Sequence, residues 1–348
     1  MNTDVRSLAR SMRRRQLLLG SAGALLAGAM PRLARAQGAL QVGGLPVTCN
    51  LTLPIACLMA TEGEGKSAKG SGQPFEFAKY SGWPELKESL MSGRLQAAYM
   101  LAPLIMDLAD KKIPVKTVAL GHRSGAVIMV RTDSPYTNFK TLRGKRIAIP
   151  SRFAVDYLFL RKMLQREGMA EKEVEVVEMA PPDMPAALYA KAVDAYATGE
   201  PFGAVAQRAG YARPLSMTRD HWPLYICCVL TVHENLIRKN RPLVQQLVNH
   251  VLAAGQWLDA GPVNRLKGIE IAAGPRFFNQ DVNVLKFVME NPADRVTYGD
   301  LKLVKAEFDE LMQLSIQAGT MKRHVPYEAY IDESFVKNAS AARVRLTA

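Results

Sequence analysis

The sequence predicts an α/β protein with two lobes, the first of which is built from two separate stretches of chain. From Leu45 onward, short β-branched or apolar runs alternate with amphipathic stretches, which is the pattern of strands followed by helices. The pattern restarts near residue 141, and most of residues 241–314 reads as helices without strands of their own. We therefore expect these late helices to cover the first sheet, with the chain crossing twice between lobes. The predicted limits are 37–133 and 222–348 for the first lobe and 134–221 for the second, with hinges near Arg131–Pro135 and His221–Tyr225.

Hydrophobic periodicity assigns the elements of the first lobe. Apolar or alternating runs predict the strands Val47–Leu53, Phe75–Tyr80, Leu95–Leu101, Val115–Leu120 and Val127–Thr132. Apolar residues at helical spacing predict the helices Ile55–Glu62, Trp83–Met91 and Pro103–Lys111. The stretch Glu64–Gln73 is rich in glycine, serine and lysine and predicts a loop.

The second lobe begins with a turn that feeds a strand at Thr141–Pro150. Phe153–Glu167 is predicted to be a helix because its apolar residues recur at helical spacing. The remaining predicted elements of this lobe are the strands Val174–Met179 and Val193–Thr198 and the helices Met184–Tyr189 and Pro201–Arg208. A strand at Tyr225–Val232 then returns the chain to the first lobe.

Composition excludes several classes of protein. Of the 348 residues, 48% are hydrophobic and 22% are charged, which is enough apolar material for a large core and excludes a disordered chain. The longest uncharged apolar run has 16 residues, between Arg15 and Arg32, whereas about 20 are needed to span a bilayer. Four cysteines are too few for a disulfide-built scaffold, and no pair has metal-site spacing.

The first 36 residues predict an export signal. Seven arginines and one aspartate there contribute +6 of the net charge of +13, so the remainder is only mildly basic and no nucleic-acid partner is expected. The run Arg13–Leu18 precedes a weakly hydrophobic core and an Ala34-Arg35-Ala36 cleavage pattern, as in a twin-arginine signal. An ordinary secretory signal and an organellar transit peptide are the alternatives. We expect cleavage before Gln37 and a soluble, monomeric protein in the periplasm.

Most catalytic motifs are absent from the sequence. Gly65-Lys66-Ser67 would end a phosphate-binding loop only if glycine stood at the position of Ala60. The five histidines include no i, i+4 pair, so metal catalysis and a resident cofactor are not expected. Cys227 and Cys228 lie in an apolar run typical of core residues, while Cys49 and Cys57 could form a disulfide in an oxidising compartment.

Several predicted strands are followed by helix starts that glycine or proline marks. Helix N-termini carry unpaired N–H groups and a positive dipole end, so a group of them suits an anionic or strongly polar solute. In open α/β sheets such a site lies at the carboxyl ends of the strands. These junctions supply the candidate ligand-binding residues Leu53, Pro54, Gly82, Trp83, Ala102, Pro103, Ser151, Arg152, Tyr196, Thr198, Gly199 and Glu200.

Each polar candidate also has a purely structural explanation. Trp83 either lines the cleft or anchors its helix, and Ser151 either touches the solute or serves only as an N-cap. Arg152 is a counter-ion for an anion or a solvated surface charge. Glu200 contacts a solute or metal, or stabilises a helix dipole.

Three segments resemble the type 2 periplasmic binding proteins of ABC importers. Leu142–Ala148 looks like the opening of their second lobe. Gly82–Leu86 and Met91–Pro103 are similar to the nitrate/sulfonate/bicarbonate-binding branch, with its small-residue turn and x-Asp-Ala-Ala-x-Met-Leu-x-Pro strand. Thr198–Phe202 resembles the Glu-Pro-aromatic turn of that branch. Gln96 replaces the usual aspartate and Phe202 the tryptophan of nitrate and bicarbonate members.

The resemblance implies a two-lobed binding protein that captures a small polar or anionic solute in its cleft. Its partners would be an ABC permease and ATPase at the inner membrane. The same family includes binders of taurine, other sulfonates and pyrimidine vitamin precursors, so the solute stays open. An enzyme on the same fold, such as a relative of pyrimidine-precursor synthesis, and a ligand-sensing subunit are the alternative functions. The absence of a catalytic grouping favours binding.

Overall fold

The computed structural model describes residues 39–59, 74–340 and 344. The predicted export signal, the predicted loop at Glu64–Gln73 and the end of the predicted helix Ile55–Glu62 lie outside these residues. Among the described residues, no helix combines the length and the apolar character that crossing a bilayer requires.

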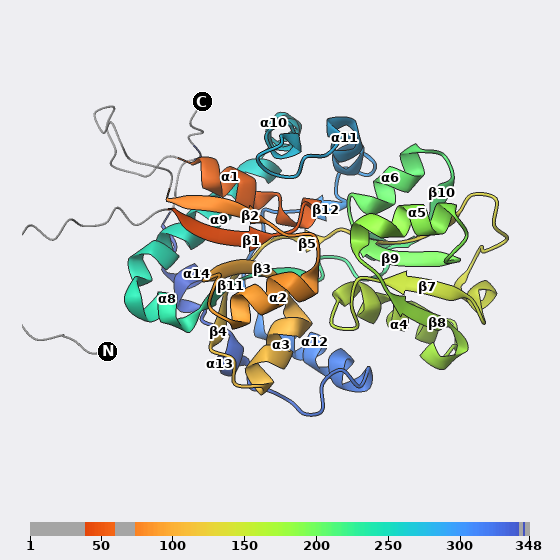
Figure 1. Cartoon of the computed structure of the whole chain (residues 1–348), viewed down its shortest axis with the longest axis horizontal. Helices are drawn as coiled ribbons and strands as arrows, with labels where there is room; N and C mark the ends of the chain where they lie inside the picture. Colours follow the sequence, from red (N-terminus) through yellow and green to blue (C-terminus); the bar gives the residue numbers. More distant parts are fainter. Residues whose placement is uncertain (1–38, 60–73, 341–343, 345–348) are drawn as a thin grey trace, which may run out of the picture. The chain divides into compact units, whose positions relative to one another are not determined.

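The first sheet has five strands in the order β2-β1-β3-β11-β4 (Figure 1). β1 is parallel to β2 and to β3, whereas β11 runs antiparallel between β3 and β4. The start of β11 therefore lies at the same edge as the carboxyl ends of its neighbours. The strands are β1 (Leu40–Gly44), β2 (Phe75–Lys79), β3 (Ala97–Leu101), β4 (Val115–Leu120) and β11 (Cys228–His233).

Helices pack on this sheet and on one another. α1 contacts β2, α2 contacts β3, and α9 and α14 contact β4, while α10 packs on α9. α11 and α12 also contact helices of the second sheet, α6 and α4 respectively. These helices are α1 (Thr52–Leu58), α2 (Trp83–Met91), α3 (Ala102–Asp110), α8 (Glu234–Lys239), α9 (Arg241–Asp259), α10 (Pro262–Ala273), α11 (Val282–Glu290), α12 (Lys305–Gln317), α13 (Tyr327–Tyr330) and α14 (Ser334–Lys337).

The second sheet has the strand order β10-β6-β9-β7-β8. β7 is parallel to β8 and β9, and β6 runs antiparallel to both β9 and β10. Its strands are β6 (Ala126–Arg131), β7 (Arg146–Ile149), β8 (Glu175–Glu178), β9 (Ala195–Gly199) and β10 (Ala212–Met217). Its helices are α4 (Val155–Arg166), α5 (Met184–Tyr189), α6 (Phe202–Arg208) and α7 (Thr218–His221).

The prediction of a strand at Val47–Leu53 is wrong. The strand lies upstream, at β1, and Thr48–Asn50 forms a 3-10 helix (η1) that leads into α1. Every residue of η1 is buried, and so is α1 up to Cys57. An apolar run buried on all sides has no period that separates a strand from a short helix. Pro54 is tolerated within the first turn of α1, where the missing N–H has no helical partner.

The first crossing between sheets comes earlier than the predicted hinge at Arg131–Pro135. β6, expected in the first lobe, pairs with β9 and β10, so the chain changes sheet between Leu120 and Ala126. Within this stretch, β5 (Arg123–Ser124) pairs with β12 (Val296–Thr297). The return lies between Met217 and Cys228 and includes the predicted His221–Tyr225. We keep the division into two lobes as a proposal, with 126–133 moved to the second.

Candidate functional site

A small cavity is lined by residues that come from both sheets. Its volume is about 20 Å³, which is room for roughly one water molecule. The first sheet and its connections contribute Val47, Cys49, Trp83, Leu101, Cys227 and Cys228. The second contributes Pro150, Asp156, Pro181, Thr198 and Gly199. This is the kind of position in which the sequence predicts a solute cleft.

The pairing of β11 brings distant segments to the cavity. Cys228, the first residue of β11, lies opposite Leu101, the last residue of β3. The Gly121 N–H donates to the Cys228 carbonyl at 2.9 Å, which holds the neighbouring His122 beside the start of β11. The Ala102 N–H likewise donates to the Cys227 carbonyl at 3.1 Å. An antiparallel strand between two parallel neighbours thus assembles this side of the site.

Two residues that line the cavity carry oxygens with no hydrogen-bond partner. Asp156 Oδ1 and Thr198 Oγ1 are buried and unpartnered within the described part of the chain, and so is the hydroxyl of Tyr225. Burial raises the pKa of Asp156 to about 8, so this carboxyl is mostly neutral at pH 7. Native proteins satisfy nearly all buried polar groups, and a polar solute or a water molecule held in this cavity would pair with these oxygens.

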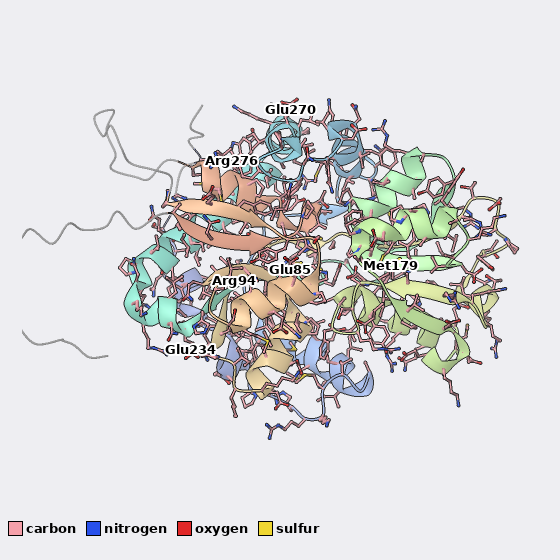
Figure 2. All side chains as sticks on the ribbon, viewed as in Figure 1. Glu85, Arg94, Met179, Glu234, Glu270 and Arg276 are labelled. Atoms are coloured by element: carbon pink, nitrogen blue, oxygen red, sulfur yellow. The ribbon has the colours of Figure 1, made fainter. Side chains whose placement is uncertain are left out.

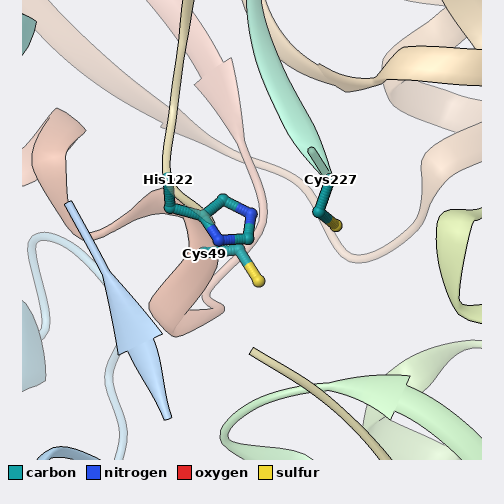
Figure 3. Close-up of side chains that lie close together, drawn as sticks. All are labelled: Cys49, His122 and Cys227. Carbon is teal, nitrogen blue, oxygen red and sulfur yellow. The ribbon is translucent and has the colours of Figure 1, made fainter. Parts of the chain in front are cut away.

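Three further side chains converge at the same place: Cys49 from η1, His122 from the loop after β4, and Cys227 before β11 (Figure 3). One ligand atom from each lies within 4.8 Å of the others, and all three residues are buried. All four cysteines are free, so the possible Cys49–Cys57 disulfide is not formed. The spacing in the sequence gives no sign of this cluster, because its members are far apart along the chain.

Hydrogen bonds among the cysteines shift the pKa values of their thiols. Hydrogen bonds from Cys227 and Cys228 lower the pKa of Cys49 to about 6, against the effect of its burial. The pKa of Cys227 is raised. Its hydrogen bond with Cys228 and the nearby His122 ring lower this pKa, but the hydrogen bond that Cys227 donates to Cys49 and the burial of the thiol raise it by more. Cys49 is therefore the cavity-lining thiol that loses its proton most readily.

Three of the residues predicted from the sequence line the cavity: Trp83, Thr198 and Gly199. Trp83 is the first residue of α2, directly after the extended N-cap Gly82. Thr198 and Gly199 end β9. The junction geometry that motivated these predictions is therefore present at α2 and β9.

Four other predicted residues are buried but do not line the cavity. Ala102 and Pro103 begin α3, directly after Leu101, and are buried. Leu53 and Pro54 are buried in the first turn of α1. Ala102 and Pro103 thus begin a helix beside the lining residue Leu101, whereas Leu53 and Pro54 follow η1 and not the strand that the sequence predicts there.

Ser151 and Arg152 are occupied by local contacts away from the cavity. The Ser151 hydroxyl accepts a hydrogen bond from the Phe153 N–H at 3.1 Å, in the turn before α4, whose N-cap is Ala154. Arg152 donates to Glu171 at 2.8 Å, and its side chain is 45% exposed. Ser151 is therefore not the N-cap of α4, and Arg152 is an ion-paired side chain, so contact of either residue with a solute stays a prediction.

Tyr196 and Glu200 are buried by contacts within the protein. The Tyr196 hydroxyl donates to the Phe202 carbonyl at 2.9 Å. Glu200 accepts hydrogen bonds from the Ala204 N–H and from Arg295, both at 2.9 Å. Burial raises the pKa of Glu200 and outweighs the effect of Arg295, which lowers it. This carboxylate joins the end of β9 to the segment after α11.

A larger hollow lies between α4 and α12, with a volume of about 470 Å³. Its charged side chains are paired: Arg161 with Glu171, and Lys162 with Glu310 at 3.1 Å. None of its lining residues has a buried unpartnered polar atom within the described residues. Other charged side chains, such as Glu85 and Arg94, are exposed at the surface (Figure 2). The smaller cavity is therefore the better candidate site.

Comparisons with known proteins agree on one family. The model of the NMT1-like family matches residues 35–273. The nitrate import ATP-binding protein NrtC of Synechococcus elongatus is 30% identical over 59% of this chain and 34% of its own length. The nitrate/nitrite binding protein NrtA of Nostoc is 23% identical over 75% of this chain and 62% of its own length. The chain thus spans from one third to about three fifths of these relatives.

Solved structures share the fold over most of the chain. The ligand-binding component of an ABC-type import system from Staphylococcus aureus, solved with zinc bound, has a TM-score of 0.77 at 27% identity, covering 88% of this chain and 100% of that one. Nitrate-binding NrtA from Synechocystis has a TM-score of 0.74 at 17% identity, covering 86% and 87%. The desulfurization enzyme DSZB has a TM-score of 0.62 at 17% identity, covering 86% and 98%.

Proposed function

The chain belongs to the NMT1-like family and has the type 2 periplasmic-binding-protein fold, and from this premise we propose that it is the solute-binding component of an ABC importer. The solute is a small polar or anionic molecule of the nitrate, sulfonate, bicarbonate or small organic acid type. It binds in the cavity that the two sheets share and is delivered to a membrane permease and its ATPase. The predicted twin-arginine signal would place the protein in the periplasm.

The observation that carries this proposal is the pair of unpartnered oxygens in the cavity wall. Thr198 comes from the second sheet and Asp156 from α4, and each has a buried oxygen that no described residue satisfies. A hydroxyl and a neutral carboxyl both donate hydrogen bonds, which suits a solute that presents oxygen acceptors. Trp83 supplies an apolar part of the same cavity lining. A solute with an oxyanion head and a small body fits this combination.

Contacts between the two sheets' elements support binding by closure. The Thr48 N–H and hydroxyl both donate to the Glu200 carbonyl at 2.9 Å, joining η1 to the end of β9. A cavity that holds roughly one water molecule is too small for most of the proposed solutes. We therefore propose that the lobes separate at the crossings 120–126 and 217–228 to admit the solute, and close on it as hinged domains do.

The solute-binding role is tested by a thermal-shift screen of the protein against nitrate, bicarbonate, sulfonates, aromatic carboxylates and pyrimidines. A solute that binds only the folded state raises the unfolding midpoint, and the rise grows with the ratio of its free concentration to its dissociation constant. The expected hit is an oxyanion whose shift is reduced in Thr198→Val. No shift with any of these solutes, or shifts identical in Thr198→Val, would argue against this site.

A second function, catalysis on the same fold, is favoured by the Cys49 thiol. Its pKa is lowered to about 6, it lines the cavity, and a ring nitrogen of His122 lies within 4.8 Å of its sulfur, which is the environment of a nucleophilic cysteine. Recovery of the bound solute separates the two functions. A binding protein returns it chemically unchanged, whereas an enzyme yields product in a reaction that Cys49→Ser abolishes.

A further inference from the structure

We propose that Cys49, His122 and Cys227 bind a thiophilic metal ion, of the class of Zn²⁺ or Cu⁺, in the wall of the cavity. The three side chains converge from three separate segments (Figure 3). Two thiolates and one imidazole form a donor set that soft and borderline ions prefer over Mg²⁺ or Ca²⁺. This inference goes beyond the proposed function, because it holds whether or not the protein delivers a solute.

The distances between the donor atoms fit a single ion. One atom of each residue lies within 4.8 Å of the other two. A tetrahedral ion with bonds of about 2.3 Å to sulfur and about 2.0 Å to nitrogen holds its ligands roughly 3.3 to 3.8 Å apart. Small side-chain rotations therefore suffice to bring the three atoms onto one ion. The Cys57 thiol, buried in α1, is not part of this cluster.

The hydrogen bonds of His122 leave one ring nitrogen available. Nε2 accepts a long hydrogen bond from the Cys228 N–H, at 3.3 Å. Nδ1 is fully buried and has no hydrogen-bond partner of normal geometry among the described residues. Ligation through either nitrogen costs at most this one long hydrogen bond, because ligation through Nδ1 moves the ring proton to Nε2. A bond to a metal is much stronger than such a hydrogen bond.

Charge balance favours a cation at this place. Buried ions are tolerated only when they are paired. Two coordinating thiolates neutralise a divalent ion, and the ion itself drives their deprotonation. Three protein ligands also leave a fourth position, as in zinc sites that take up a water molecule or a substrate. Because Cys49 and Cys227 line the cavity, this position is accessible to a solute held there.

A disulfide does not account for these cysteines in the structure. All four are free, and the sulfurs of the adjacent Cys227 and Cys228 are 3.8 Å apart. A disulfide would require about 2.05 Å. A disulfide also gives no role to the buried histidine beside the thiols. In metal sites with thiolate ligands, histidine is a usual further ligand.

The test uses the full chain, reduced and stripped of metal, and Zn²⁺ titrated in competition with a colour-changing chelator. We expect one tight equivalent, with a dissociation constant below about 1 μM. Cys49→Ser and Cys227→Ser should each weaken this binding by roughly 100-fold or more. Cys57→Ser is the matched control, since it removes a buried thiol outside the cluster and should bind like the wild type.

Co²⁺ loading of the unmodified chain provides a measurement that needs no variant. Thiolate ligands give bound Co²⁺ an intense near-ultraviolet charge-transfer absorption, which oxygen and nitrogen ligands do not. Absence of this band, absence of a tight Zn²⁺ equivalent, or Zn²⁺ binding by folded Cys49→Ser and Cys227→Ser at wild-type strength would each refute the metal site. Thermal shifts with nitrate, with and without Zn²⁺, separate this failure from failure of the proposed solute function.

Discussion

The buried pair of Glu200 and Arg295 gives the sharpest prediction about stability. The two side chains are 0% and 3% exposed and meet at 2.9 Å. Replacing Arg295 with Met keeps much of the apolar volume but leaves the Glu200 carboxylate buried with only backbone donors. Removing one partner of a buried pair costs about 3–5 kcal/mol. Because Arg295 also contacts Gln207 at 3.2 Å, we expect Arg295→Met to lie within this range.

The double variant Glu200→Gln/Arg295→Met isolates the charge effect. Gln at position 200 keeps a side-chain acceptor for the Ala204 N–H and removes the unpaired charge, so we expect it to recover about half or more of the loss. The assay is urea denaturation followed by circular dichroism. Lys305→Met, which breaks an exposed pair with Asp309, is the control and should not measurably change stability. A double variant no more stable than Arg295→Met would refute the reasoning.

The pH dependence follows from the direction of the pKa shift. Burial raises the folded pKa of Glu200 above its ordinary value of 4.5, and loss of Arg295 raises it further. A carboxyl whose pKa is higher in the folded than in the unfolded state does not destabilise the protein while it is protonated. It lowers the free energy of unfolding once the pH rises above the pKa of the unfolded state. The deficit of Arg295→Met relative to the wild type should therefore be small near pH 4 and grow toward pH 7. A deficit that is constant with pH would show that the loss comes from packing alone.

The remaining predictions concern binding, motion and export. Trp83→Ala should weaken solute binding by about 2–4 kcal/mol in calorimetry, and Thr198→Val by about fivefold, whereas wild-type affinity in both would place the solute elsewhere. Ser151→Ala should leave affinity unchanged and cost about 1 kcal/mol of stability, because its hydroxyl accepts a hydrogen bond from the Phe153 N–H; a loss of affinity would return Ser151 to the site. Small-angle scattering should show compaction on addition of a solute that binds, and unchanged scattering would contradict hinged closure. Arg14→Lys together with Arg15→Lys should strand the precursor in the cytoplasm, and normal export of that variant would indicate an ordinary secretory signal.

The candidate site could be predicted only in part from the sequence. Trp83, Thr198 and Gly199 could be predicted from the sequence, because glycine and proline mark the ends of strands and the starts of helices. Cys49, His122 and Cys227 could not be predicted as site residues, because each of them, taken alone, is typical of a core residue in an apolar segment. Asp156 also gives no local signal, because an acidic residue in the first turn of a helix is expected at the surface.

The sequence by itself determined the class of fold, most of its elements and the family. Alternation between strand and helix patterns, and glycine at tight turns, are local properties that each segment carries alone. Tertiary structure decided which segments meet. The antiparallel β11 brings Cys227 and Cys228 to the carboxyl end of β3, and the pairing of β6 moves the first crossing to 120–126. It also pairs the Glu200 side chain with Arg295 and the Arg152 side chain with Glu171. These outcomes depend on contacts between residues that are distant along the chain, and local periodicity holds no information about such contacts.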